Sequence, residues 1–373
     1  MYFAFRIRPK DRPQVYQIDP NIRSASTLPA DFYRSQESWK EVMKRVFERN
    51  WIFLGDEQQM FRGMNTTFPM TLLENYLQEP ILLTQSDDEI RCLTNVCTHR
   101  GFKIVDAPSI DKNLRCQYHG RKFGLDGSFL TMPEFDEAED FPRACDNLHR
   151  LPLVNWRRFL FTAIEDPNDQ SVYDYLNERM YFLPIEDFQY APELSKTYNV
   201  HANWALYIDN YLEGFHIPFV HMDLGKVIDY GSYATECSGN AVLQIGYSRN
   251  SDFTFDLPKG HPDADREVTA YYYWLYPNFM LNFYPWGVQT NHVRPITPDF
   301  CKVDFEYYIH DEKIFRLMQG DKLAEKTERE DEFVVEAVQE GIKSRFYPGG
   351  RFSPTREQGV HHFHKLLAEA MNR

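Results

Sequence analysis

Apolar residues follow two different patterns along the chain, and the pattern of the first half is strand-like. It is preceded by a short helix, because residues 38–49 have helical spacing and lead into the apolar run 51–55. From there to about residue 161, short runs such as 81–84 and 90–96 alternate apolar and polar residues between turn formers. This alternation is typical of antiparallel strands. We therefore predict an all-β unit that follows an extended arm over residues 1–30, which is polar and holds four prolines.

The second pattern mixes helices and strands. Residues 203–216 place Trp204, Ile208, Tyr211 and Phe215 at helical spacing, and Pro218 is expected to end this helix. Strands are predicted at 270–276, 279–284 and 301–309. A second long helix is predicted near the C-terminus, at 320–342. Strands enclosed by long helices indicate an α+β domain.

Length, charge and cysteine content narrow the functional classes. A chain of 373 residues is long enough for two domains with real cores. The net charge of −14 without a Lys/Arg cluster argues against a nucleic-acid partner. No apolar run is long enough for a signal peptide or a membrane-spanning helix, so we expect no membrane partner and a cytoplasmic location. Four of the six cysteines lack disulfide-like spacing and are interpreted as buried thiols: Cys92, Cys145, Cys237 and Cys301.

Two Cys/His pairs form the most informative motif. Cys97-Thr98-His99 is followed by Cys116-Gln117-Tyr118-His119, so two loops supply two thiolates and two imidazoles. This is the ligand set of a Rieske [2Fe–2S] cluster, in which two Cys hold one iron and two His hold the other. A structural zinc site is the alternative, because zinc also takes Cys₂His₂. Zinc fingers usually pair Cys with Cys and His with His, however, so the mixed halves favour the cluster.

A second set of metal ligands lies in the α+β part. His216 and His221 flank Pro218 near a predicted helix end, where both imidazoles can converge on one ion. Two His and one carboxylate form the facial triad of non-haem Fe(II) oxygenases, which leaves positions open for O₂ and substrate.

Asp331 is the best candidate for the carboxylate ligand. It shares one predicted helical face with Val334, Val335 and Val338, whereas the neighbouring glutamates mostly lie elsewhere. A carboxylate on an apolar face needs a positive partner, which iron would provide. The alternatives are an acidic, solvated helix with Asp331 at its boundary, and Asp321 as the ligand.

These motifs together resemble the oxygenase (α) component of the Rieske non-haem iron oxygenases from about residue 35 to the C-terminus. The stretch 330–341 resembles the family's third-ligand helix, and the other matching motifs are Cys97-x-His99-Arg100-Gly101, Cys116-x-x-His119-Gly120 and Asn210-Tyr-Leu-Glu213-Gly-Phe-His216-x4-His221. The resemblance implies an all-β Rieske domain over residues 46–160 and a helix-grip catalytic domain with an antiparallel sheet over 161–373. It also implies that the arm and helix at 1–45 pack with the catalytic domain.

The resemblance further implies how electrons reach the mononuclear iron. In this family an acidic residue three positions before the first iron His bridges the two centres across a subunit boundary, and here that position is Glu213. The alternative is a surface acid. We expect a homotrimer in which Glu213 accepts a hydrogen bond from His99 or His119 of the adjacent chain, although a hexamer is also compatible. Gly214 departs from the commoner residue of the family.

The implied reaction is O₂-dependent and needs a partner. An NAD(P)H-dependent flavin or ferredoxin-type reductase is expected to supply electrons. Glutamate at position 213 resembles the choline, carnitine and glycine-betaine branch, so hydroxylation or N-demethylation of a quaternary ammonium or betaine-like molecule is expected. Ring hydroxylation of an aromatic acid is the alternative, and an electron-transfer protein without catalysis is a remote one.

The aromatic residues and the C-terminal histidines have less specific interpretations. Rings can bind a quaternary ammonium by cation–π attraction, but most of the aromatic residues at 271–286 are expected to be core. We expect structural or interface roles for His361, His362 and His364.

Overall fold

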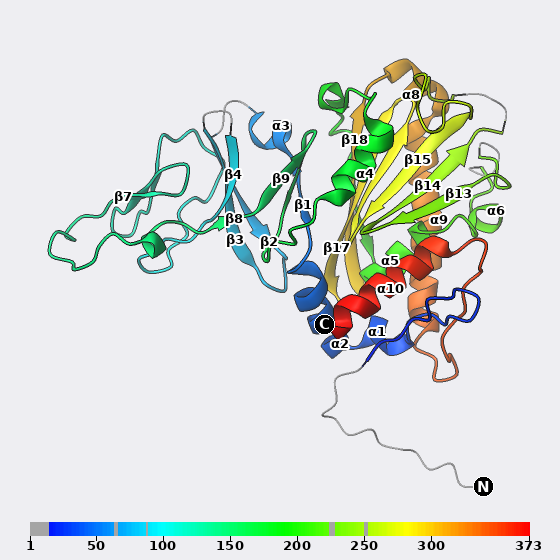
Figure 1. Ribbon diagram of the computed structural model, residues 1–373, viewed down its shortest axis with the longest axis horizontal. Helices are drawn as coiled ribbons and strands as arrows, with labels where there is room; N and C mark the ends of the chain where they lie inside the picture. Colours follow the sequence, from blue (N-terminus) through cyan, green and yellow to red (C-terminus); the bar gives the residue numbers. More distant parts are fainter. Residues whose placement is uncertain (1–14, 63–65, 87–88, 224–227, 250–252) are drawn as a thin grey trace, which may run out of the picture.

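The computed structural model describes residues 15–62, 66–86, 89–223, 228–249 and 253–373. The first part is built from three small antiparallel sheets, with strand orders β1-β10-β9, β2-β3-β4-β8 and β5-β6-β7 (Figure 1). The strands are β1 (Ile52–Asp56), β2 (Thr67–Leu72), β3 (Glu79–Ser86), β4 (Glu89–Thr94), β5 (Leu114–Arg115), β6 (Lys122–Phe123), β7 (Phe129–Thr131), β8 (Arg150–Leu151), β9 (Leu153–Trp156) and β10 (Phe159–Thr162). The short helices here are α3 (Glu57–Met60) and η3 (Ala144–Asp146).

The second part is one large antiparallel sheet with helices on it. Its strand order is β11-β18-β17-β16-β15-β14-β13, and β12 also pairs with β18. The strands are β11 (Gln189–Tyr190), β12 (Lys196–Val200), β13 (Ala234–Ser238), β14 (Ala241–Tyr247), β15 (Val268–Leu275), β16 (Phe279–Tyr284), β17 (Gly287–Thr297) and β18 (Phe300–Ile309). The helices are α4 (Ser171–Met180), η4 (Ile185–Asp187), α5 (Trp204–Tyr211), α6 (Ile217–Val220), α8 (Glu312–Met318), α9 (Gly320–Gly341) and α10 (Gln358–Asn372).

Strand alternation divides the core of the large sheet between its two faces. One face packs against α5, α9 and α10, so that Trp274 shares a cluster with Trp204. The other face packs Tyr271 and Tyr273 against α4 and against residues of the first part. Both faces are therefore covered, and the α+β fold class expected from the sequence is confirmed.

The segment before the first strand packs on the second part. α1 (Ala30–Arg34), α2 (Gln36–Val42) and the π-helical turn η1 (Met43–Phe47) place Phe32 and Trp39 in the same cluster as Trp204. Residues 1–14 of the expected arm lie outside the described residues. The proposed domain limits at 45/46 and 160/161 stay a prediction.

A buried arginine, which pairs with an aspartate of the first part, and a ring stack join the two parts. Asp56 of β1 and Arg158 are each 1% exposed, with Arg158 Nη2 2.6 Å from Asp56 Oδ2. The guanidinium also lies over the ring of Tyr308 on β18. Phe53 of β1 stacks on Phe279 of β16 at 4.0 Å. The first part is thereby fixed to the face of the large sheet that is opposite α5, α9 and α10.

The helix predicted at 203–216 is shorter than expected. α5 ends at Tyr211, and Pro218 lies in the first turn of a separate helix, α6, so the prediction that Pro218 ends the first helix is wrong. The physical reason is that the first turn of a helix tolerates a residue without an N–H donor. The side chain of Glu213 accepts hydrogen bonds from the backbone N–H groups of Phe215 and His216 between the two helices.

Among the described residues, no helix has the length and apolar character needed to cross a membrane.

Candidate active site

Two matched turns hold the Cys/His pairs of the first part. Gly101 donates its N–H to the carbonyl of Cys97 at 2.9 Å, and Gly120 donates in the same way to Cys116 at 3.0 Å. Both glycines have a positive φ, 71° and 77°, which glycine adopts without steric cost. The two turns therefore present their Cys and His side chains toward one place.

The four side chains divide into a buried and a solvent-facing half. Cys97 and Cys116 are each 2% exposed, and their thiols are in hydrogen-bond contact. The rings of His99 and His119 lie 4.8 Å apart, and His119 is exposed. Burial raises the pKa of the Cys97 thiol, so a thiolate there needs a positive partner. This donor set fits a cluster with one buried thiolate-bound iron and one imidazole-bound iron nearer the surface.

Three ligand atoms converge at the other candidate centre. His216 Nε2 lies 3.0 Å from His221 Nε2, and Asp331 Oδ1 lies 3.0 Å from His221 Nε2 and 3.5 Å from His216 Nε2. Two ligands bound at roughly 2.1 Å and at right angles are about 3.0 Å apart, so this triangle matches one face of an octahedral ion. His216, His221 and Asp331 thus form a group able to hold a metal ion.

Each imidazole is oriented by a further carboxylate. His216 Nδ1 lies 2.6 Å from Glu213 Oε1, and His221 Nδ1 lies 2.8 Å from Glu330 Oε2. A carboxylate that accepts the Nδ1 proton leaves the Nε2 lone pair free for a metal. Burial alone would lower the pKa of His221, but hydrogen bonds to Asp331 and Glu330 raise it. The site therefore favours a positive charge between its ligands.

Asp331, and not Asp321, accompanies the two histidines. Both aspartates belong to α9, but Asp321 lies in its first turn, ten residues or roughly 15 Å before Asp331. The buried residues of α9 are Glu328, Val335 and Gln339, and Asp331 is half-buried at the edge of their face. Val338, which was expected on the face of Asp331, is 42% exposed, because it lies on the side of Asp331 away from Val335 and Gln339.

The C-terminal histidines make separate contacts. His361 Nε2 lies 2.8 Å from the carbonyl of Asp19, and His362 Nε2 lies 2.8 Å from that of Gly239. His364 bonds Tyr33 and Asp209 at 3.1 and 2.9 Å. These contacts fasten α10 to other segments and bring no shared ligand set together.

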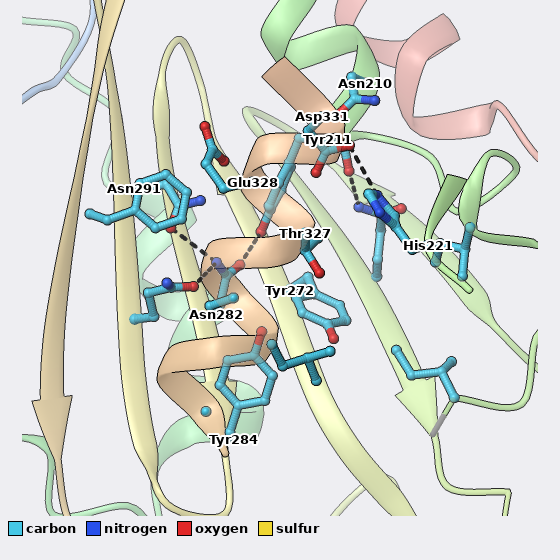
Figure 2. Close-up of a pocket in the computed structure, with 18 of the residues that line it drawn as sticks. Asn210, Tyr211, His221, Tyr272, Asn282, Tyr284, Asn291, Thr327, Glu328 and Asp331 are labelled. Atoms are coloured by element: carbon cyan, nitrogen blue, oxygen red, sulfur yellow. Dashed lines mark hydrogen bonds and ion pairs between the residues drawn. The ribbon is translucent and has the colours of Figure 1, made fainter. Parts of the chain in front are cut away.

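A cavity of about 140 Å³ opens beside the His216/His221/Asp331 group. Figure 2 shows Thr327, Glu328 and Asp331 on α9 facing Tyr272, Asn282 and Tyr284 of the sheet. A polar row crosses its wall in register, formed by Gln244, Tyr272, Asn282 and Gln289. Asn282 donates to Gln289 and Asn291 and accepts from Tyr211 at 2.6 Å. The wall is therefore a connected network of neutral polar groups.

Aromatic rings complete the cavity. The lining rings are Tyr207, Tyr211, Tyr233, Tyr272, Tyr284, Trp286 and Phe305. Tyr284 stacks on Trp286 at 5.0 Å. A Cβ atom at position 214 would lie 2.8 Å from the ring of Tyr233, so Gly214 allows this ring to pack closely.

Some residues at the cavity and its metal triangle were not predicted from the sequence, and others were. Glu328 was not singled out, although its spacing of three residues from Asp331 places it on the same helix face. Glu330 was among the glutamates expected mostly off the face of Asp331, but its long side chain reaches His221. Of the aromatic residues noted at 271–286, those that line the cavity are Tyr272, Tyr284 and Trp286.

Glu328 is the lining acid with the deepest burial. It is 3% exposed, and burial raises the pKa of its carboxyl well above the usual range. Tyr207 donates a hydrogen bond of 2.6 Å to its Oε2 atom. Its Oε1 atom has no hydrogen-bond partner among the described residues.

Comparison with known families matches both parts of the chain. Residues 50–142 match the Rieske [2Fe-2S] domain, and residues 188–373 match the catalytic domain of the ring hydroxylating alpha subunit. The chain is 28% identical over 369 residues to the carnitine monooxygenase oxygenase subunit of Escherichia coli, with 94% of this chain and 95% of the relative covered. It is 27% identical over 375 residues to the chloroplastic choline monooxygenase of Beta vulgaris, with 96% and 81% covered.

Solved structures show the same fold. A quaternary ammonium Rieske monooxygenase in complex with an inhibitor superposes with a TM-score of 0.74 at 24% identity, with 96% of this chain and 100% of that chain covered. Naphthalene 1,2-dioxygenase from Rhodococcus sp. superposes with a TM-score of 0.71 at 16% identity, with 92% and 94% covered.

Proposed function

The chain belongs to the Rieske non-haem iron oxygenases, and we propose that it is the oxygenase component of a two-component monooxygenase for a quaternary ammonium or betaine-like molecule. The observation that carries this proposal is the triangle of His216, His221 and Asp331 beside a cavity walled by tyrosines. The named relatives support the substrate class, because they are a carnitine and a choline monooxygenase. A catalytic domain over residues 188–373 excludes the electron-carrier alternative.

The cofactors are a Rieske [2Fe–2S] cluster and a mononuclear iron, as the two matched domains imply. Cys97, Cys116, His99 and His119 would hold the cluster, and His216, His221 and Asp331 would hold the Fe(II). Together these groups supply the electrons and the O₂ activation that hydroxylation needs.

The remaining side chains position the reactants. Glu213 and Glu330 hold the imidazoles with Nε2 directed at the metal. Tyr272 and Tyr284 line the cavity, and rings there can bind a methylated ammonium group by cation–π attraction, which stabilises it by roughly 0.5–2 kcal/mol per contact.

The reaction balances as substrate C–H plus O₂, NAD(P)H and a proton, giving C–OH, water and NAD(P)⁺. Oxygen insertion into an N-methyl group gives a hemiaminal that collapses to formaldehyde and the demethylated amine. Oxygen insertion at a carbinol carbon gives an aldehyde hydrate instead. The electrons come from an NAD(P)H-dependent reductase, and we expect both proteins in the cytoplasm.

We further propose assembly into a homotrimer with electron transfer between subunits. In one chain the β5-β6-β7 sheet, which carries the Cys116 turn, lies at the opposite end of the molecule from α6 and α9 (Figure 1). Exposed apolar residues surround both candidate centres: Phe102 and Tyr118 near the cluster turns, and Phe215, Phe219, Met222 and Phe333 near α6 and α9. A head-to-tail interface would cover both patches, and closure of such an interface gives a ring.

A turnover assay tests the proposed function. The holoenzyme is mixed with NADH, a reductase and choline, carnitine, glycine betaine or stachydrine, and products are identified by mass spectrometry. Formaldehyde or an aldehyde hydrate from one of these compounds is expected. A phenol or cis-diol formed from an aromatic acid, with no turnover of any ammonium compound, would contradict the proposal.

A further inference from the structure

The charge of the cavity lining is one-sided. Among the described lining residues, the acids are Glu213, Glu328 and Asp331, and none is Lys or Arg. Glu213 bonds His216 and Asp331 belongs to the metal triangle, so both acids already face positive or hydrogen-bonding partners. Glu328 is the lining acid that the iron centre does not use.

Glu328 presents an unpartnered oxygen at a buried site. Its Oε2 atom accepts from Tyr207, whereas its Oε1 atom has no partner among the described residues and the side chain is 3% exposed. An unsatisfied buried polar group costs about 1–3 kcal/mol, and more if it is charged. Burial raises the pKa of the Glu328 carboxyl and so favours its neutral form without a ligand, whereas a cation beside Oε1 would satisfy this atom and favour the carboxylate.

We propose that Glu328 is the counter-charge for the cationic head of the substrate, so that the pocket selects a cation with a neutral remainder over a zwitterion that carries a carboxylate. This inference rests on the proposed function and names the substrate class within it: choline-like compounds rather than betaine-like or carnitine-like ones.

Position along α9 supports the assignment. Glu328 precedes Asp331 by three residues, so their Cβ atoms are roughly 5–6 Å apart on one helix face. A cationic head beside Glu328 therefore places its neighbouring carbons close to the metal triangle. Tyr284 and Tyr272, which lie across the cavity from α9 in Figure 2, present rings to the same space.

The rest of the wall explains the discrimination against a carboxylate. Gln289, Asn282 and Asn291 are buried neutral amides that form one hydrogen-bonded group. Such amides bind a hydroxyl without any change in charge. A substrate carboxylate would enter a buried space with acids on α9 and without a cationic side chain among the described lining residues. The Fe(II) would be its remaining positive partner, and binding there would occupy a coordination position that O₂ needs.

Binding to the holoenzyme tests the inference without dependence on the reductase. Isothermal titration calorimetry compares choline with 3,3-dimethylbutan-1-ol, its uncharged carbon isostere, and with glycine betaine. Wild type is expected to bind choline at least tenfold more tightly than either compound. Equal affinity for choline and the isostere, or tighter binding of glycine betaine, would overturn the inference.

Three variants separate charge from structure. Glu328→Gln keeps the shape and a hydrogen-bonding group for Tyr207 but loses the charge, and it is expected to bring the choline/isostere ratio close to one. Glu328→Asp keeps the charge on a shorter side chain and is expected to retain part of the preference for choline. Glu325→Gln changes an acid of the same helix that pairs with Lys196 at the surface, and should leave the ratio unchanged. If Glu328→Gln folds and keeps the wild-type choline/isostere ratio, the role of Glu328 is structural.

The wild-type comparison stands even if Glu328→Gln fails to fold. Turnover of carnitine or glycine betaine without turnover of choline would overturn this inference and leave the proposed function intact. Turnover of aromatic acids alone would overturn both.

Discussion

The Oε1 atom of Glu213 lies 2.6 Å from Nδ1 of His216, so this carboxylate sets the direction in which His216 presents Nε2. The same carboxylate accepts backbone N–H groups at the break between α5 and α6. Glu213 is thus fixed by local contacts at the edge of an exposed apolar patch that includes Phe215 and Phe219.

Glu213→Gln tests whether this residue only orients His216 or also bridges two subunits. Glu330→Gln is the matched control, because Glu330 orients His221 in the same way from α9. Loss of an orienting carboxylate costs about 10- to 100-fold in metal affinity or activity. We expect both variants to keep iron, and Glu213→Gln to slow oxidation of the reduced cluster far more, as stopped-flow absorbance would measure. Equal rates in the two variants would contradict a bridging role.

Asp331→Asn and Asp321→Asn test the third ligand. Asp331→Asn removes the charged ligand, so we expect loss of about one iron per chain and of product, with the visible absorbance of the cluster unchanged. Asp321→Asn should keep the iron, because Asp321 lies in the first turn of α9, ten residues before Asp331. Metal analysis together with the visible spectrum distinguishes these outcomes. Retention of iron and activity by Asp331→Asn would refute the assignment.

The two candidate metal sites differ in how far the sequence alone could predict their ligands. Cys97, His99, Cys116 and His119 are close in the chain, so local spacing was sufficient to identify the cluster motif. The identification of Asp331 as a ligand depended on helix periodicity and family resemblance, because 110 residues separate it from His221 in the sequence.

Other features depend on tertiary contacts that no local pattern contains. The end of α5 is set by the side chain of Glu213, which replaces helical hydrogen bonds, and the sequence suggested a longer helix. Tyr272 and Tyr273 are neighbours of the same type, but strand alternation sends Tyr272 to the cavity and Tyr273 to the opposite face. The register across four strands decides which side chain lines the site.

Arg158→Ala tests the link between the two parts of the chain. It leaves Asp56 as a buried, unpaired charge, and we expect a loss of about 3–5 kcal/mol in the free energy of unfolding. Arg316→Ala removes an exposed pair with Glu312 and should cost at most about 0.5 kcal/mol. Urea unfolding followed by fluorescence measures both. Similar losses in the two variants would mean that the buried pair contributes little.

His292 gives the stability a pH dependence. It packs against the stacked rings of Phe53 and Phe279, and burial lowers its pKa to about 4 although Asp304 lies nearby. The unfolded chain binds a proton near pH 6.5 and the folded chain does not, so stability falls as the pH decreases from 6.5 toward 4. Relative to His292→Gln, wild type should lose about 1–2 kcal/mol between pH 7 and pH 5. Parallel pH profiles from urea unfolding would contradict this.

The central claim is that this chain inserts one oxygen atom from O₂ into a methylated ammonium compound. The most direct measurement is turnover of choline with reductase and NADH under ¹⁸O₂, with the product trapped by reduction before its aldehyde oxygen exchanges with water, followed by mass spectrometry. We predict ¹⁸O in the product: formaldehyde released from an N-methyl group carries the one ¹⁸O atom inserted in each turnover. An aldehyde formed at the carbinol carbon is partly labelled, because its hydrate loses either the new or the original hydroxyl oxygen. One contradictory result would be consumption of NADH while choline and the other ammonium compounds are recovered unchanged. The other would be ¹⁸O found only in hydroxylated aromatic acids.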